Sequence, residues 1–197
     1  MRHGDTELNS TNRYWGHTNV RLSASGLRQA ERLRHRLASQ KIDAIYASNL
    51  CRASMTAGVI AFSHQLDIIT CAELREINFG KLEGLTFKEI SQLYPELFKT
   101  LMQRDPNLRF PGGESLDELG NRVGKFVGRL EKHTDEETIL IVIHSGVLRT
   151  LICQLLGIGL RHFYQFVPDL ASLSILETYS EGAILSRFND ISHLDGI

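Results

Sequence analysis

The chain alternates short apolar runs with longer segments in which apolar residues recur every three or four positions. Short runs rich in Ile, Val and Ala favour strands, whereas the three-to-four spacing favours amphipathic helices. The predicted strands cover residues 42–47, 67–70, 138–143, 171–178 and 183–188. The predicted helices cover residues 24–38, 50–62, 85–104, 115–132 and 146–156. Strands that alternate with helices predict an α/β protein.

Local signals mark the ends of several of these helices. Ser23 is a natural N-cap for the first helix, Pro95 opens a second segment within residues 85–104, and Gly157 ends the last helix. The first helix is expected to bury one face, made by Leu27, Ala30, Leu33 and Leu37.

The run Thr138–Ile143 (TILIVI) is apolar almost throughout, as expected for a strand buried on both faces. We therefore predict a three-layer α/β/α fold, with a mostly parallel open sheet and helices on both faces. The length of 197 residues suits a single domain over 1–197, in which 85–115 forms a small helical cap insertion. In such sheets, ligands bind beyond the carboxyl ends of the strands.

Composition excludes several classes of protein. Lys and Arg number 22 against 23 Asp and Glu, so the chain lacks the basic excess of a nucleic-acid-binding domain. No apolar run is long enough to span a bilayer, and no signal peptide is visible. The three cysteines form no CxxC pair and are expected to be reduced thiols in a cytoplasmic protein. We expect a small-molecule ligand, no nucleic acid and no membrane, and we leave a homodimer open.

Candidate chemistry begins at Arg2-His3-Gly4. A histidine that accepts a phosphoryl group is helped by an arginine fork on the phosphate oxygens and by a glycine that lets backbone approach the anion. Arg52 follows the strand that ends at Ser48, and His144 directly follows strand 138–143. Helices begin at both places, and helix N-termini favour anions. Taken singly, His3 could be a surface histidine and Arg52 a charge on a helix surface, and His144 could cap its helix or satisfy a core hydrogen bond.

Four segments together resemble the histidine phosphatase superfamily, the phosphoglycerate-mutase-like proteins. They are RHGDTELN (2–9), SNLCRASMTA (48–57), LREINFGKLEG (74–84) and HSG (144–146), with GHTNVRLSASG (16–26) and PGGES (111–115) between them. The resemblance implies that His3 is phosphorylated, that Arg2, Arg52, His144 and Asn9 hold the phosphoryl oxygens, and that Glu76 protonates the leaving group. It also implies substrate contacts from Thr6, Trp15, Gly16 and Ser145, with no metal and no cofactor.

The chain departs from this pattern at its start. Family members usually carry several apolar residues before Arg-His-Gly, which form the central strand, whereas only Met1 precedes Arg2 here. We therefore expect either that this strand is missing or that something else fills its place. Asn19 and Arg21 stand where Asp and Pro are common in relatives, so this loop is expected to contact substrate differently. Glu73 and Glu83 lie close enough to Glu76 in sequence to be alternatives to it.

Between Gly84 and Gly112 the chain has no adjacent pair of arginines, the feature that in the mutases of this family binds the substrate carboxylate. The sequence therefore favours a metal-independent phosphomonoesterase acting on a small phosphorylated metabolite. The small bacterial phosphatases that it resembles include α-ribazole phosphatase. A mutase-type phosphotransferase and a non-catalytic phospholigand-binding protein are the alternatives. Five aromatic residues either stack on the substrate or pack the cap: Tyr14, Trp15, Phe87, Tyr94 and Phe98.

Overall fold

The centre of the protein is a parallel sheet, seen in a computed structural model that describes residues 1–105 and 107–196. Strand β1 (Ala44–Ser48) lies between β2 (Ile68–Cys71) and β3 (Ile139–Val142). Both neighbours run parallel to β1. The predicted parallel sheet is confirmed; β1 and β3 are a little shorter than the apolar runs that predicted them, and β2 is shifted by one residue.

Residues Met1–His3 continue this sheet beyond β3. The N–H of His3 donates to the carbonyl of Ile143 at 2.9 Å, and the N–H of Ile143 donates to the carbonyl of Met1 at 3.0 Å. On the other side, the N–H of Arg2 donates to Ser172 and the N–H of Ala171 donates to His3. Of the two alternatives for the first strand, the structure supports the second, because these three residues fill its place beside β3.

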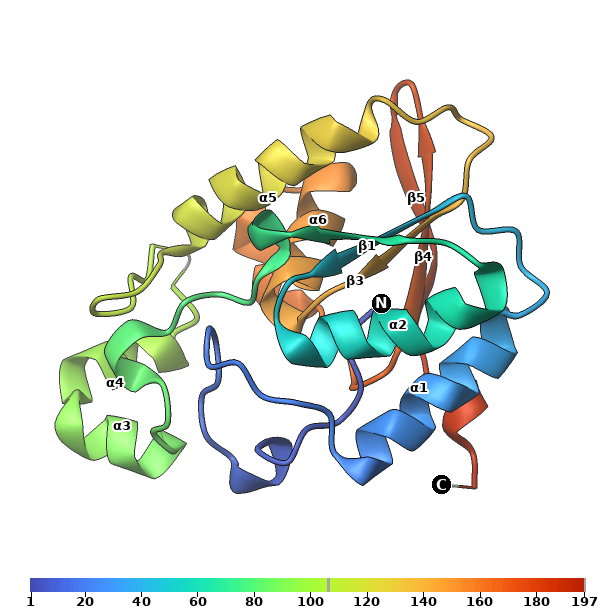
Figure 1. The fold of residues 1–197 in the computed structure, drawn as a ribbon. Helices are drawn as coiled ribbons and strands as arrows, with labels where there is room; N and C mark the ends of the chain where they lie inside the picture. The colour runs from blue at the N-terminus through green and yellow to red at the C-terminus, as the bar shows by residue number, and fades with distance from the viewer. Residues whose placement is uncertain (106, 197) are drawn as a thin grey trace.

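Two layers of helix cover the sheet, as Figure 1 shows. Helices α1 (Ala24–Leu37) and α2 (Cys51–His64) lie on one face, and α5 (Leu116–Leu130) and α6 (Ser145–Leu155) lie on the other. Ile45 packs into the core under α1 and α2, whereas its neighbour Tyr46 packs into the core under α5 and α6. This alternation follows from the two-residue period of a strand. The three-layer α/β/α fold is confirmed.

Most helix ends follow the local signals. Ser23 Oγ accepts the N–H of Gly26 at 3.0 Å, and Ser115 and Glu118 form a capping box at the start of α5. Gly157, with φ +65°, follows the end of α6. The prediction for Leu27 is wrong: this residue is 41% exposed, because it lines an open groove between α1 and α2 instead of packing in the core.

The chain between the sheet and α5 forms two short helices, α3 (Phe87–Leu93) and α4 (Pro95–Met102), set apart from the sheet in Figure 1. Pro95 opens α4, as predicted. Phe87 and Phe98 pack edge to face on each other, with ring centroids 4.8 Å apart. Tyr14 likewise packs on Phe79, at 4.9 Å. The structure therefore supports a packing role, rather than stacking on the substrate, for Tyr14, Phe87 and Phe98.

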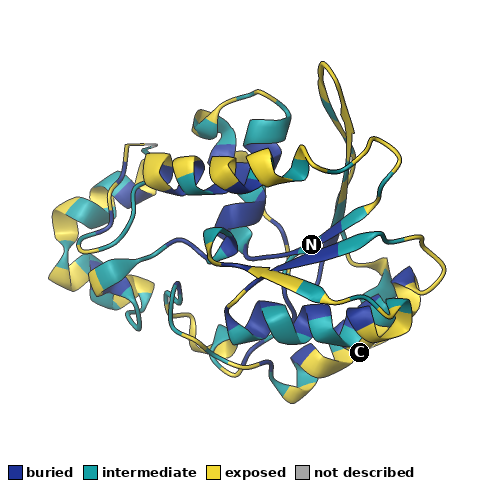
Figure 2. Ribbon diagram, turned by 45° about the horizontal axis from the view of Figure 1, so that its top comes forward, coloured by how far each residue is buried: buried dark blue, intermediate teal, exposed yellow. Residues whose placement is uncertain are grey.

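The C-terminal part of the chain adds an antiparallel hairpin of β4 (Leu173–Tyr179) and β5 (Gly182–Asp190), whose tip is exposed in Figure 2. No helix in residues 1–105 and 107–196 is long and apolar enough to cross a membrane. Short 3-10 helices complete the fold: η1 (Asn9–Thr11), η2 (Ala72–Leu74), η3 (Gly80–Leu82), η4 (Leu160–Gln165) and η5 (Ser192–Leu194).

Candidate active site

His3 lies at the end of the N-terminal segment that bridges to Ile143, and it is 4% exposed. Its Nδ1 is 2.7 Å from the carbonyl oxygen of Gly4. A carbonyl only accepts, so Nδ1 carries the proton and Nε2 keeps a free lone pair. Burial, followed by the positive charges of Arg52 and Arg2, lowers the pKa of His3 well below its usual 6.5. The imidazole is therefore neutral at physiological pH, with one nitrogen available as a nucleophile.

The side chains of Arg52 and His144 bond to each other next to His3. The Nε–H of Arg52 donates to Nδ1 of His144 at 3.2 Å, and the rings of His3 and His144 are 5.0 Å apart. Because an arginine only donates, Nδ1 of His144 is the acceptor and its Nε2 carries the proton. This Nε2 is buried and has no hydrogen-bond partner among the described residues. Burial, and then the charge of Arg52, lowers the pKa of His144 well below 6.5. His144 thus offers a neutral N–H donor.

Arg2 and Asn9 bring further donors to the pocket. Nη1 of Arg2 donates to the carbonyl of Pro168 at 2.8 Å, while its buried Nε has no partner among the residues described. Oδ1 of Asn9 accepts both the N–H and the hydroxyl of Thr6, at 2.8 and 2.6 Å. These bonds fix the amide of Asn9 so that its NH₂ group is not used by Thr6.

Glu76 is 7% exposed and reaches the start of α6. Its Oε1 accepts the backbone N–H groups of Gly146 and Ile77, each at 2.9 Å. A Cβ added to Gly146 would lie only 2.5 Å from Oε1 of Glu76, so the glycine allows the carboxyl group to approach the helix terminus. The alternatives Glu73 and Glu83 do not take this place: Glu73 pairs with Arg129, and Glu83 binds the loop described next.

Glu83 organises the loop that holds Arg52. Its carboxylate accepts the backbone N–H groups of His17 at 2.6 Å and of Thr18 at 2.9 Å. The same loop turns the carbonyls of Gly16 and Thr18 toward Arg52, whose two Nη atoms donate to them at 2.8 Å. Asn19, one of the departures from the family pattern, accepts the first N–H of α2, that of Cys51, at 2.7 Å.

These residues surround a small cavity of about 50 Å³. The lining of this cavity is cationic, because it contains two guanidinium groups, from Arg2 and Arg52, and one carboxyl group, from Glu76. Of the other predicted site residues, His144 and Ser145 are not part of the lining. Gly16 contributes through its carbonyl, which accepts from Arg52. The lining residues are Arg2, His3, Thr6, Asn9, Trp15, Val20, Arg52 and Glu76.

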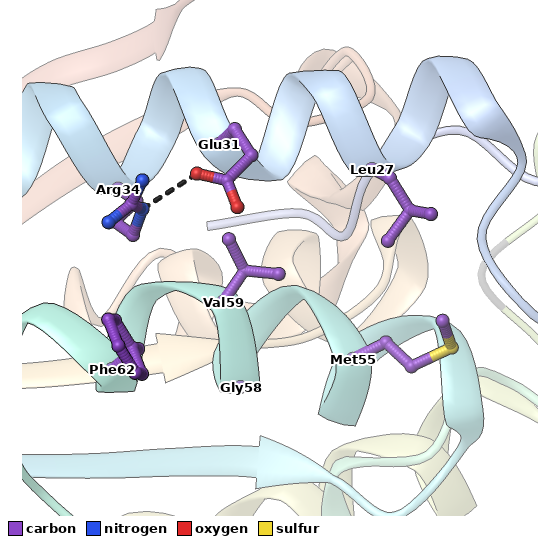
Figure 3. A pocket seen from close by; sticks show the side chains of 7 residues that line it. All are labelled: Leu27, Glu31, Arg34, Met55, Gly58, Val59 and Phe62. Carbon is purple, nitrogen blue, oxygen red and sulfur yellow. Dashed lines mark hydrogen bonds and ion pairs between the residues drawn. The ribbon is translucent and has the colours of Figure 1, made fainter.

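A larger hollow of about 480 Å³ lies elsewhere, between the outer faces of α1 and α2 (Figure 3). The side chains that line it are mostly apolar. The two charged ones pair with each other, as Nε of Arg34 donates to Glu31 at 2.7 Å. Phe62 at its edge is 80% exposed. The groove contains none of the predicted site residues and is separate from the cavity at His3.

Sequence reasoning missed several residues of this site. Val20 lines the cavity, and the hydroxyl of Thr56 accepts the N–H of Gly4 at 3.1 Å. Thr56 falls one turn after Arg52 on α2, a spacing that is visible in the sequence. Among residues 1–105 and 107–196, no three His, Cys, Asp or Glu side chains gather so as to hold a metal ion.

Comparison with known proteins agrees with this geometry. Residues 1–191 match the model of the histidine phosphatase superfamily, branch 1. The chain belongs to this superfamily, and the predicted enzyme class, a phosphoric monoester hydrolase, is confirmed.

Three relatives illustrate the similarity. Phosphoserine phosphatase 1 of Hydrogenobacter thermophilus is 33% identical over 98% of this chain and 92% of its own length. The adenosylcobalamin/alpha-ribazole phosphatase of Escherichia coli is 30% identical over 96% of this chain and 93% of its own. The crystal structure of the alpha-ribazole phosphatase from Shigella flexneri superposes with a TM-score of 0.89 at 30% identity, covering 96% and 94% of the two chains. The chain is thus similar to phosphatases with different substrates.

Proposed function

We propose that this chain is a metal-independent phosphomonoesterase that works through a phosphohistidine at His3. The observation that carries the proposal is the bond between Nδ1 of His3 and the carbonyl of Gly4 at 2.7 Å. It leaves the lone pair of Nε2 free in a cavity lined by two guanidinium groups. A neutral, oriented imidazole among cations is suited to attack a phosphate dianion.

The reaction proceeds in two steps. In the first, Nε2 of His3 forms a bond to phosphorus, the ester P–O bond breaks, and Glu76 in its protonated form gives its proton to the leaving alkoxide. In the second, Glu76 takes a proton from water, the oxygen of that water bonds to phosphorus, and the N–P bond breaks to release phosphate. Phosphoryl transfer depends mainly on positioning and on stabilising charge at the equatorial oxygens. Arg2, Arg52, Asn9 and the Nε2–H of His144 supply these donors.

The substrate is a small phosphorylated metabolite, and α-ribazole 5′-phosphate is one candidate because a relative of nearly full overlap is named for α-ribazole. We further propose that residues 85–115 form the cap over the site. This agrees with the contact between Tyr14 and Leu85, where the N–H of Tyr14 donates to the carbonyl of Leu85 at 3.0 Å. A homodimer stays a prediction, to be checked by light scattering.

Rapid quenching during turnover of p-nitrophenyl phosphate tests the proposal. Mass spectrometry is expected to find an acid-labile phosphoryl group on His3, with turnover that persists in EDTA and is lost in His3→Ala. An adduct elsewhere, or product formation without any adduct, contradicts the mechanism. Rates no higher than those of His3→Ala favour a binding protein. Transfer of the phosphoryl group to an added alcohol in preference to water favours a mutase.

A further inference from the structure

The loop before β4, residues 168–172, contacts both Arg2 and His3 on the side away from β3. Nη1 of Arg2 donates to the carbonyl of Pro168 at 2.8 Å. The backbone N–H of Ala171 donates to the carbonyl of His3 at 2.9 Å. Because Arg2 also lines the phosphate cavity, the direction of its guanidinium group depends on where this loop places the carbonyl of Pro168.

The side chain of Asn189 fixes the shape of this loop. Its Oδ1 accepts the backbone N–H of Asp169 at 2.6 Å, and its Nδ2 donates to Oδ2 of Asp169 at 2.7 Å. One amide group therefore bonds both the backbone and the side chain of the residue that follows Pro168 in the chain. Asn189→Asp would keep the acceptor for the first bond and lose the donor for the second.

A β-bulge in the C-terminal hairpin directs Asn189 toward the loop. At the bulge, one residue of β4, Ser174, stands opposite two residues of β5, Phe188 and Asn189. Asn189 has φ +57°, a left-handed conformation that asparagine adopts more readily than most residues, and its N–H donates to the hydroxyl of Ser174 at 3.1 Å. A bulge changes the direction of a side chain relative to regular strand pairing. The hairpin thus presents the amide group of Asn189 to Asp169.

We propose that Asn189 is a positioning residue for phosphoryl transfer, which acts through Asp169 and the carbonyl of Pro168 on the guanidinium group of Arg2. The inference rests on the proposed function. Asn189 does not line the cavity, so its effect has to pass through the loop. Without the amide group, the two bonds that hold Asp169 are lost and the adjacent carbonyl is free to move. An arginine that is already held in place loses less conformational entropy when it binds phosphate.

Two substitutions at position 189 test the amide group. Asn189→Gly removes the side chain and keeps a residue suited to a positive φ. We expect it to lower both kcat/KM for p-nitrophenyl phosphate and the affinity for inorganic phosphate by about five- to tenfold, the factor that one hydrogen bond represents. Asn189→Asp should lose as much, and adding Asp169→Asn should recover activity, because donor and acceptor are then exchanged. Gln65→Gly is the matched control, since Gln65 is exposed, has φ +55° and follows the end of α2.

A comparison of two arginine variants shows whether the effect passes through Arg2. A single ammonium group cannot donate to the carbonyl of Pro168 and also contact phosphate as the fork of an arginine does. In Arg2→Lys, the loss caused by Asn189→Gly should therefore shrink to less than about twofold, because the two changes remove the same interaction. In Arg52→Lys the loss should stay at its full size, because Arg52 is held by Gly16 and Thr18 instead.

Several outcomes would overturn the proposal. Equal losses from Asn189→Gly in the wild type, Arg2→Lys and Arg52→Lys would show that Asn189 supports the fold alone. So would a lower free energy of unfolding in urea with an unchanged affinity for phosphate. Wild-type activity in Asn189→Gly, or no recovery on adding Asp169→Asn to Asn189→Asp, would exclude the pairing. Calorimetry with inorganic phosphate needs no turnover, so it decides the role of Asn189 even if the wild type hydrolyses no ester and the proposed function fails.

Discussion

The Nε–H of Arg52 donates to Nδ1 of His144 at 3.2 Å, and this bond decides that Nε2 of His144 carries the proton. With its Nη atoms tied to Gly16 and Thr18, the guanidinium has little freedom to rotate. Arg52 therefore supplies positive charge to the site and also fixes the tautomer of His144.

Replacing Arg52 by lysine keeps the charge and removes the planar fork. A single ammonium cannot bind both loop carbonyls and His144 while it also contacts phosphate. We expect Arg52→Lys to lose at least about tenfold in kcat/KM for p-nitrophenyl phosphate, equivalent to about 1.4 kcal/mol. Arg32→Lys on the exposed face of α1 is the matched control. Wild-type activity in Arg52→Lys would show that charge alone suffices.

Glu76→Gln should affect poor leaving groups most. The amide still accepts from Gly146 but cannot give a proton to an alkoxide, and general acid catalysis contributes roughly 10²–10⁴-fold. We expect a loss in that range for an alkyl phosphate and a much smaller one for p-nitrophenyl phosphate, whose leaving group needs little protonation. A plot of log kcat/KM against leaving-group pKa measures this, with Glu73→Gln as the control from the same segment. Equal losses for all leaving groups would contradict the role of Glu76 as the acid.

The two buried histidines should make the protein less stable in acid. Burial lowers the pKa of both His3 and His144 well below 6.5, so the unfolded chain binds protons that the folded chain excludes. The free energy of unfolding is therefore highest above pH 6.5 and falls below it, by up to about 1.4 kcal/mol per pH unit for each histidine. Urea denaturation between about pH 8 and pH 5 measures the slope. His144→Gln should flatten the slope, the exposed His35→Gln should not, and an equal slope in both variants would contradict the assignment.

The Glu114–Arg122 pair supports the segment that positions Glu76. Nε of Arg122 donates to Glu114 at 2.8 Å, and its Nη1 donates to the carbonyls of Glu73 and Arg75. Burial alone would raise the pKa of Glu114, but the hydrogen bonds and charge of Arg122 outweigh it and hold the pKa below its usual value. Both side chains are only 18% exposed.

Breaking this pair should be costly. We expect Arg122→Met to lower the free energy of unfolding by about 2 kcal/mol, because it leaves a half-buried carboxylate without its charged partner. The exposed pair of Arg109 and Glu118 is the matched control, and Arg109→Met should cost less than about 1 kcal/mol. Urea denaturation of both variants measures the difference. Equal losses in the free energy of unfolding would show that the half-buried pair stabilises the segment no more than the exposed pair does.

The sequence by itself determined most of the helices and strands and several of the helix ends. The apolar runs predicted β1 and β3, and Ser23, Pro95 and Gly157 marked helix ends that the structure confirms. These features are readable because they depend on local physics, namely period, caps and backbone preferences. The motifs also placed Arg52 and His144 at strand ends, where a parallel sheet brings them together.

Only the tertiary structure decided how these residues are held. Met1–His3 serves as a central strand because Ile143 on one side and Ser172 on the other supply its partners, from more than a hundred residues away. The tautomers of His3 and His144, the roles of Glu83 and Glu114 and the exposure of Leu27 depend likewise on contacts between distant segments. Periodicity and motif spacing record what a residue is and which way its own element turns. These local patterns do not show which residues of other elements pack against a given side chain. The residues that support the site could therefore be identified only from the tertiary structure.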